Sequence, residues 1–554
     1  MTAAATGPAE QPEKGKGALV IGASSLGTMF EWYDFFLYGA LAVEIARHFF
    51  SAVDETTGFI LALAAFAAGF LVRPLGALIF GRVGDIVGRK YTFLVTMGLM
   101  GVSTFVVGLL PSYDQIGIAA PIILVLLRLL QGLAIGGEYG GAAIYVAEHA
   151  PANRRGFNTG WIQTTAALGL VLSLTIIMAA RTALSPEAFA DWGWRIPFLV
   201  SIFLLGISLW IRLKLGESPI FQRMRDEAAT SKAPFAEAFG RWSNMKLVLI
   251  ALAMVAGQAV SFYASTFYIL FFLDRMLKVE PFTANLLLTA GLLLGGGFYV
   301  VFGWLSDKVG RKPILLGGLL AAGLLYIPLF HALSAAANPA LARAERTAPV
   351  IVYADPAACS VQFDPIGRAK FDQRSCDIAK STLSRTGVSY QNAALPAGAV
   401  ARVEIGAQAL AVPDPRTLPP ADKAAAITQF QQELRAALTS AGYPARADPA
   451  AIETGLVIAI LTLFIAIQTA SYGPLAAMLV ELFPARIRYT SMSVPYHIGN
   501  GWFGGFLPTT AFAIVAATGD IYAGLWYPIV VLAGSFTICL FLLPETRGRP
   551  VEHT

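Results

Sequence analysis

Charged side chains are scarce in this chain of 554 residues, because Asp, Glu, Lys and Arg together make up only 14% of it. Soluble domains usually carry about 25% charged residues. Apolar runs recur from one end of the chain to the other, and a run of about 20 apolar residues is what a helix needs to cross a bilayer core. The composition therefore excludes an ordinary soluble protein and predicts an all-α membrane protein.

Cysteine is also rare, with three residues in the whole chain. Cys539 lies in the last apolar run, whereas Cys359 and Cys376 lie in a long polar segment. Two cysteines that close a short loop on the oxidising side of a membrane predict a disulfide, although two free thiols are the alternative. The polar segment contains no nucleophile elbow, metal-binding cluster or phosphate loop. We therefore expect no enzyme activity, no metal and no cofactor apart from a coupling proton.

The net charge of +5 does not predict a nucleic-acid partner, because the basic residues are concentrated in alternate short loops. Lys and Arg in membrane proteins are enriched on the cytoplasmic side, which places both termini in the cytoplasm. The first apolar run is too long for a cleaved signal peptide. We expect a multi-pass protein of a bacterial cytoplasmic membrane, functional as a monomer, whose partners are the lipid bilayer and a small organic solute.

Twelve transmembrane spans are predicted, and their ranges are 18–45, 57–81, 91–110, 117–147, 157–181, 194–213, 246–273, 282–304, 313–333, 453–480, 490–517 and 523–543. They divide the chain into seven parts: an N-terminal tail (1–17), a six-helix half (18–214), a cytoplasmic linker (215–245), helices 7–9 (246–333), an extracytoplasmic insertion (334–452), helices 10–12 (453–543) and a C-terminal tail (544–554).

Two motifs occur twice, in the same order. Gly-x3-Asp-x2-Gly-Arg-Lys places Asp85 and Arg89 in the first copy and Asp307 and Arg311 in the second. Glu-x2-Pro-Ala-x2-Arg begins at Glu148 and again at Glu481. Repeated motifs of this kind indicate an internal duplication of six plus six helices. The two repeated aspartates and arginines are predicted to latch a cytoplasmic gate, although basic inner loops can also serve orientation alone.

The distance between these motifs is about 111 residues longer in the second half, which reveals the insertion between helices 9 and 10. Residues 349–353 and 401–405 read as strands, and 376–386 and 421–441 read as helices, so a small α/β domain is expected. Substrate capture, a docking surface and a structural cap are all compatible with it.

Five ionisable residues lie well inside predicted spans of the first half, where a charge costs roughly 2.5–3.5 kcal/mol. Helical spacing puts Glu31, Asp34 and Tyr38 on one stripe, and Arg128, Gln131 and Glu138 on another. Proton coupling is assigned to Asp34, Glu31 and Glu138. The predicted substrate-binding residues are Arg73, Arg128, Gln131, Tyr38, Gln258, Tyr472, Tyr496 and Asn500. A static ion-pair network that fixes helix packing is the alternative.

These segments resemble the metabolite:proton symporters of the major facilitator superfamily. The resemblance rests on Glu31-Trp-Tyr-Asp34-Phe-Phe-Leu-Tyr38-Gly39, Arg73-Pro-Leu-Gly76, Arg128-Leu-Leu-Gln131-Gly132, Tyr472-Gly-Pro474 and Pro544-Glu-Thr-Arg-Gly548-Arg549. It implies two six-helix halves, alternating access and proton-driven uptake, and it places Glu31, Asp34, Arg73, Arg128 and Glu138 at motif positions. The long insertion departs from the compact pattern of this family.

Several functions remain open at this point. Symport of a small organic solute, with a carboxylate favoured by the embedded Arg73 and Arg128, is the main hypothesis. A proton antiporter that exports its solute would use the same fold. The Trp-Tyr-Asp signature on the first span and the absence of a Gln-Leu-Ser run on the seventh argue against a sugar porter. A nutrient sensor with a ligand-binding outer domain is an alternative of a different class.

Overall fold

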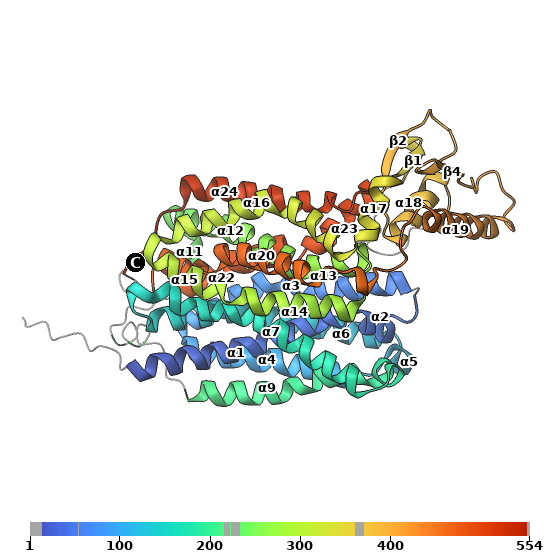
Figure 1. Cartoon of the computed structure of the whole chain (residues 1–554). Helices are drawn as coiled ribbons and strands as arrows, with labels where there is room; N and C mark the ends of the chain where they lie inside the picture. Colours follow the sequence, from blue (N-terminus) through green and yellow to red (C-terminus); the bar gives the residue numbers. More distant parts are fainter. Residues whose placement is uncertain are drawn as a thin grey trace, which may run out of the picture.

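The computed structural model describes residues 14–53, 55–214, 222, 226, 233–360 and 371–550. Long helices run side by side in one bundle, and a small domain with strands stands at one end of it (Figure 1). A helix pairs all its backbone groups internally, which is the condition for crossing hydrocarbon. Ten helical stretches of the described residues are long and apolar enough to cross a membrane.

The first half of the bundle contains the long helices α1 (Lys14–Ala40), α3 (Glu55–Ile86), α4 (Arg89–Leu109), α6 (Ala119–His149), α7 (Arg155–Ala183) and α9 (Arg195–Leu213). Short elements connect them: α2 (Ala42–Phe49), α5 (Tyr113–Ile116), η1 (Ala152–Arg154), α8 (Pro186–Ala188) and η2 (Phe189–Gly193). Helix α1 coincides with the first predicted span, and it is not among the ten stretches that meet the length and hydropathy test.

The second half begins with α11 (Pro234–Gly240) and is interrupted more often. Its elements are α12 (Trp242–Tyr263), η3 (Ala264–Tyr268), α13 (Ile269–Phe271), η4 (Phe272–Met276), α14 (Pro281–Gly296), α15 (Phe298–Val309), α16 (Arg311–Ala337), α20 (Thr454–Tyr472), α21 (Leu475–Leu482), α22 (Arg488–Ile498), η7 (Gly499–Gly504), α23 (Leu507–Thr518), η8 (Ala523–Leu525) and α24 (Trp526–Leu542). Turns of π-helix interrupt the seventh and eleventh predicted spans, at η3, η4 and η7. Such turns often mark functional positions.

Between α16 and α20 lies the inserted domain. It contains α17 (Pro339–Thr347), β1 (Val350–Ala354), η5 (Pro356–Ala358), α18 (Ser375–Thr386), β2 (Gln391–Ala394), β3 (Arg402–Ile405), β4 (Gln408–Ala411), α19 (Lys423–Ser440) and η6 (Pro449–Ala451). The strands form one sheet in the order β2-β1-β3-β4, in which β1 and β2 are parallel. Cys359 and Cys376 are joined by a disulfide.

The inserted domain is attached to the end of the bundle opposite the start of α1 and the end of α24 (Figure 1). The backbone N–H of Tyr390 donates to the carbonyl of Gly519 at 2.8 Å, and the N–H of Ala447 donates to the carbonyl of Lys278 at 3.0 Å. Gly519 has a φ of +81°, and the ring of Tyr390 occupies the space that a side chain there would need. We call this end of the bundle the insertion end, and the opposite end the latch end.

Candidate functional site

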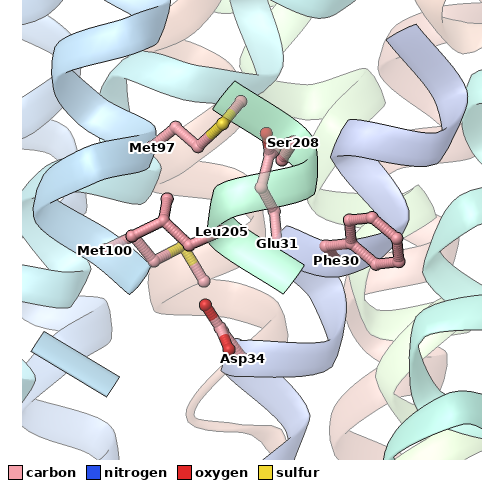
Figure 2. A pocket seen from close by; sticks show the side chains of 7 residues that line it. All are labelled: Phe30, Glu31, Asp34, Met97, Met100, Leu205 and Ser208. Carbon is pink, nitrogen blue, oxygen red and sulfur yellow. The ribbon is translucent and has the colours of Figure 1, made fainter. Parts of the chain in front are cut away.

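Glu31 and Asp34 lie on the side of α1 that faces α4 and α9. Both side chains are almost fully buried, with exposed fractions of 7% and 6%. They border a small cavity between the three helices (Figure 2), whose other lining residues are Phe30, Met97, Met100, Leu205 and Ser208. Arg212 of α9 contacts the Glu31 carboxylate at 3.5 Å. Two buried acids therefore share one compartment within the first half.

Arg128 of α6 lies near Asp34 but does not line this cavity. Its guanidinium is 4.0 Å from the ring centroid of Tyr38, and it lies close enough to Asp34 for the two charges to interact. Within the described residues, Nε and one terminal nitrogen of Arg128 and Oδ1 of Asp34 have no hydrogen-bond partner. Buried polar groups are normally paired, so these atoms are available for a water, a proton or a solute.

Arg73 of α3 occupies a different place, at the boundary between the two halves. Its guanidinium packs over the rings of Phe35 and Phe70, at 4.5 and 4.2 Å from their centroids. From the second half it interacts with Tyr263, and Tyr472 and Tyr496 are near enough to act on its charge. No acidic side chain in the described part of the chain pairs with it, although it is 2% exposed. This is an environment that suits an anion.

The predicted residues of the second half divide into paired and unpaired groups. The hydroxyls of Tyr472 and Tyr496 hydrogen-bond to each other at 2.8 Å, and Asn500 donates to the carbonyl of Tyr496 in its own helix at 3.1 Å. Gln258 is fully buried, and neither of its amide atoms has a partner among the described residues. The same holds for both ring nitrogens of His497. Gln258 and His497 therefore both present unsatisfied polar atoms in the described part of the second half.

The remaining predicted residues are placed less centrally or lie outside the description. Gln131 donates to the hydroxyl of Thr104 on α4 at 2.8 Å, and its carbonyl oxygen has no partner in the described part. The Tyr38 hydroxyl donates to the carbonyl of Ala62 at 3.1 Å. The side chains of Glu138 and Arg89 lie outside the described residues.

The sequence predicts that the five embedded charges of the first half, three acids and two bases, face one cavity, but those whose side chains are described fall into two groups. Asp34, Glu31 and Arg128 lie around α1 inside the first half, whereas Arg73 lies at the boundary with the second half. The sequence analysis did not identify Arg212 as a partner of Glu31. The one feature that could have indicated it is the presence of a basic residue in the last turn of the sixth predicted span. Within the described chain, no group of three or more His, Cys, Asp or Glu side chains could hold a metal.

The latch end is closed by ion pairs between the two halves. Glu148 of the first half pairs with Arg488 of the second at 2.9 Å, and Glu481 of the second half pairs with Arg155 of the first at 2.9 Å. Each repeated Glu-x2-Pro-Ala-x2-Arg motif thus supplies a glutamate to the arginine of the other copy. Two ion pairs therefore join the two halves, and the sequence analysis did not predict them.

The repeated aspartates follow the same crosswise pattern. Asp85 accepts hydrogen bonds from the backbone N–H of Tyr489 and Thr490, at 3.3 and 3.0 Å. Asp307 accepts from the N–H of Gly156 and Phe157, at 2.8 and 2.7 Å. In both cases an anion sits on the first turn of a helix, where unpaired N–H groups and the helix dipole favour negative charge. The helices concerned are α22 and α7, each in the opposite half.

Arg311 joins the second of these clusters. It pairs with Asp307 at 2.6 Å and with Glu481 at 3.1 Å, and it is fully buried. The C-terminal tail enters here as well, because the Thr546 hydroxyl donates to Glu481 at 2.9 Å and Glu545 accepts from the backbone N–H of Arg311 at 2.9 Å. These contacts lie within the second half, and they attach Arg311 and the C-terminal tail to Glu481, which itself pairs with Arg155 of the first half.

Comparison with known proteins matches residues 19–238 and 436–554 to the family model described as sugar (and other) transporter. The proline/betaine transporter of Escherichia coli K12 is 37% identical over 329 residues, which are 57% of this chain and 65% of the relative. The chain therefore spans about two thirds of that relative's length. The shikimate transporter of the same organism is 39% identical over 318 residues, covering 56% of this chain and 72% of the relative.

A third relative is the citrate-proton symporter of Klebsiella pneumoniae, which is 35% identical over 325 residues, covering 58% of this chain and 72% of the relative. Among solved structures, the major facilitator superfamily proton:xylose symporter XylE aligns with a TM-score of 0.63 at 14% identity. That alignment covers 97% of this chain and 98% of XylE, and at this identity it shows the fold alone. The relatives and structural neighbours named here are transporters.

Proposed function

Because this chain belongs to the sugar (and other) transporter family of the major facilitator superfamily, we propose that it is a secondary active transporter that couples uptake of a small organic carboxylate to a proton. The observation that carries this proposal is Arg73. It is a buried cation at the boundary of the halves, it lies among tyrosines, and none of the described acids pairs with it. A solute carboxylate would meet it with charge-assisted hydrogen bonds, which guanidinium groups favour.

The proton is assigned to Asp34, beside Arg128. A carboxylate with an unpartnered oxygen can accept a proton, and a neighbouring guanidinium that switches between the carboxylate and the solute would link the two events. Gln258 and His497 supply neutral polar groups on the facing wall. They are proposed to bind a second polar group of the solute, while Tyr472 and Tyr496 adjust to its entry.

The topology forms part of the same proposal. Helix α1 and the interrupted helix α22–η7–α23 complete twelve spans in two halves of six. The latch end faces the cytoplasm together with both termini, and the inserted domain stands outside a bacterial inner membrane. The latch would then break and re-form as the halves rock, in the manner of alternating access.

Uptake into proteoliposomes under an imposed inward proton gradient tests this function. The probes are labelled shikimate, citrate, alpha-ketoglutarate, proline and glycine betaine, each with and without an uncoupler. Uncoupler-sensitive accumulation of a carboxylate is expected, and R73Q should abolish it. R181Q is the matched control, because Arg181 is 44% exposed and makes an ion pair with Glu44. Accumulation that R73Q leaves intact would contradict the assignment of Arg73.

A further inference from the structure

Six arginine side chains of the described chain are buried, and Arg73 differs from the other five in having no acid as its partner. Each of the other five has a carboxylate beside it or near it: Arg128 has Asp34, Arg155 and Arg311 have Glu481, Arg212 has Glu31, and Arg488 has Glu148. A guanidinium group remains charged at any physiological pH. Arg73 therefore brings one positive charge to the boundary of the halves, and none of the described acids pairs with it.

The polar groups that surround Arg73 are neutral. Tyr263 hydrogen-bonds to its guanidinium, and Tyr472 and Tyr496 are near enough to act on its charge. His497 is within reach of the same charge. Because His497 is 1% exposed and lies close to a permanent cation, it stays unprotonated. The boundary thus offers one charge and several neutral hydrogen-bonding groups.

Several of these groups have atoms without a hydrogen-bond partner among the described residues. They include Nε of Arg73, both ring nitrogens of His497 and both amide atoms of Gln258. Gln258 precedes Phe262 by one turn of α12, so the two share a face of that helix, and the ring centroid of Phe262 is 5.7 Å from that of Tyr472. Buried polar atoms are normally paired. These neutral atoms suit hydroxyl or carbonyl groups of a solute, whereas Arg73 suits its charge.

A second charge on the solute would have no described partner at this boundary. A further carboxylate, as in citrate or alpha-ketoglutarate, would be buried without a cation of its own, and an unpaired buried charge is costly. An ammonium group, as in proline, would need an acid. A quaternary ammonium ion can bind to aromatic faces instead. Arg73 already covers the faces of Phe35 and Phe70, at 4.5 and 4.2 Å from their centroids, and its charge repels another cation.

We propose that the solute is a monocarboxylate with an uncharged polar body, and that the lone cation Arg73 selects it against dicarboxylates, tricarboxylates and zwitterions. This rests on the proposed function, which places the solute carboxylate on Arg73. Gln258 and His497 form hydrogen bonds with hydroxyl or carbonyl groups of the body. The selection depends on the number of charges that the site can pair, so it is a property of binding and can be measured apart from transport.

Binding to the purified full-length protein is measured through thermal unfolding, because a ligand of the folded state raises the unfolding temperature. Benzoate and cyclohexanecarboxylate are compared with terephthalate and cyclohexane-1,4-dicarboxylate, which carry one more carboxylate on the same ring. Each monocarboxylate should bind at least about tenfold more tightly than its dicarboxylate. R73Q should lose this binding, and R73K should keep the preference because it keeps the charge. R181Q, whose arginine is 44% exposed and pairs with Glu44, is the control.

A converse variant adds a cation. Q258K supplies a second positive charge on the α12 side of the boundary, so it should narrow the preference for benzoate over terephthalate by at least about tenfold. An effect of this kind does not follow from a loss of packing, which would weaken the binding of both probes alike. If Q258K does not fold, the four probes on the wild-type protein still decide. An unchanged preference in folded Q258K would count against the proposal.

Equal or tighter binding of the dicarboxylates to the wild-type protein would overturn the proposal, as would a lack of binding by all four probes. In the uptake panel, shikimate carries one carboxylate and neutral hydroxyls, and it should accumulate in preference to the other four solutes. Proton-coupled accumulation of citrate would overturn the single-charge inference and leave the proposed function standing. Failure of every solute to accumulate, with the monocarboxylate preference intact in binding, would reject the proposed function and leave the single-charge site standing.

Discussion

The two ends of the helical bundle are held together in different ways. At the latch end, buried charges from one half meet charges or helix N-termini of the other, as in the pairs Glu148–Arg488 and Glu481–Arg155. At the insertion end, the inserted domain is joined to the second half mainly by hydrogen bonds of neutral groups such as Tyr390 to Gly519, together with one from the Lys278 ammonium to the carbonyl of Pro444 at 3.2 Å. The ion pairs of the latch end thus join the two halves, and the inserted domain is built onto one of them.

This difference has a physical consequence. Buried ion pairs contribute modestly to net stability, because desolvation offsets their attraction, but loss of one partner is strongly destabilising. A buried ion pair suits a gate with two arrangements. In the closed one the pair is formed, and in the open one the two charges are separated and hydrated. Neutral backbone hydrogen bonds, with the Tyr390 ring packed on Gly519, suit a permanent attachment. The inserted domain should therefore move with the second half as one unit.

The largest effect is expected from E481Q, which removes a fully buried charge at the contact between the two halves. Glu481 is fully buried and accepts hydrogen bonds from Arg155, Arg311 and Thr546. Removal of its charge leaves the buried guanidinium of Arg155 without its anion, whereas Arg311 keeps Asp307 at 2.6 Å, and the expected cost to the closed state is about 3–5 kcal/mol. Uptake should be lost, and cysteines introduced at the latch end should become reactive. The hypothesis of a charge-based latch fails if both stay at wild-type values.

A smaller effect should follow from D307N and D85N, which compare the repeated aspartates. Hydrogen bonds to a charged group contribute about 1.5–3 kcal/mol. D307N should lie at the upper end of that range, since Asp307 also pairs with Arg311 at 2.6 Å, and D85N at the lower end. Thermal unfolding and latch-end accessibility measure both. D114N, an exposed aspartate that accepts from Ser51, is the control, and equal effects of all three substitutions would argue against a latch role.

The attachment of the C-terminal tail at the latch end is expected to depend on pH through Glu545. Burial alone would raise the pKa of Glu545, but hydrogen bonds from the backbone N–H groups of Arg547, Arg311, Lys312 and Thr546 outweigh burial and lower the pKa below its ordinary 4.5. A lowered pKa means that the tail's attachment is fully present above pH 4.5 and is lost as the pH falls through the lower, folded value.

Hydrogen-exchange mass spectrometry should therefore show the amides of residues 311–312 and 546–547 losing protection on acidification below pH 4.5. E545Q should reduce their protection already at neutral pH and flatten the acid response. The inserted domain should show no such change in this variant, because its attachment lies at the other end. Full protection of these amides in E545Q would contradict the assignment.

Some of this architecture could be predicted from the sequence, for identifiable reasons. Apolar runs indicated the spans because hydrocarbon imposes length and composition on any helix that crosses it. The unequal spacing of repeated motifs located the inserted domain, since an insertion changes spacing without erasing the motifs. Embedded charges such as Asp34 and Arg73 stood out because a buried charge is costly and therefore rare.

The partners of those charges could not be predicted, because they depend on the rotation of each helix about its axis and on contacts between distant segments. Glu148 and Arg155 lie seven residues apart in one motif, yet each pairs with the opposite copy, more than 320 residues away. Arg212 faces Glu31 only because α9 packs beside α1. The aromatic surroundings of Arg73 likewise come from two different halves. Helical periodicity assigns residues to a face but does not say what covers that face.

The smallest effect on transport is expected at the insertion end, from the double substitution C359S/C376S. The disulfide closes a loop with a sequence separation of 17, and a loop of that length is stabilised by roughly 3 kcal/mol on the chain-entropy model. The inserted domain should lose that stability, seen as earlier proteolysis within it, whereas uptake and latch-end accessibility stay at wild-type values. C539S, which alters a buried free cysteine of α24, is the control. If uptake falls together with the inserted domain, that domain takes part in the transport cycle, and the division between a moving latch and a passive attachment is wrong.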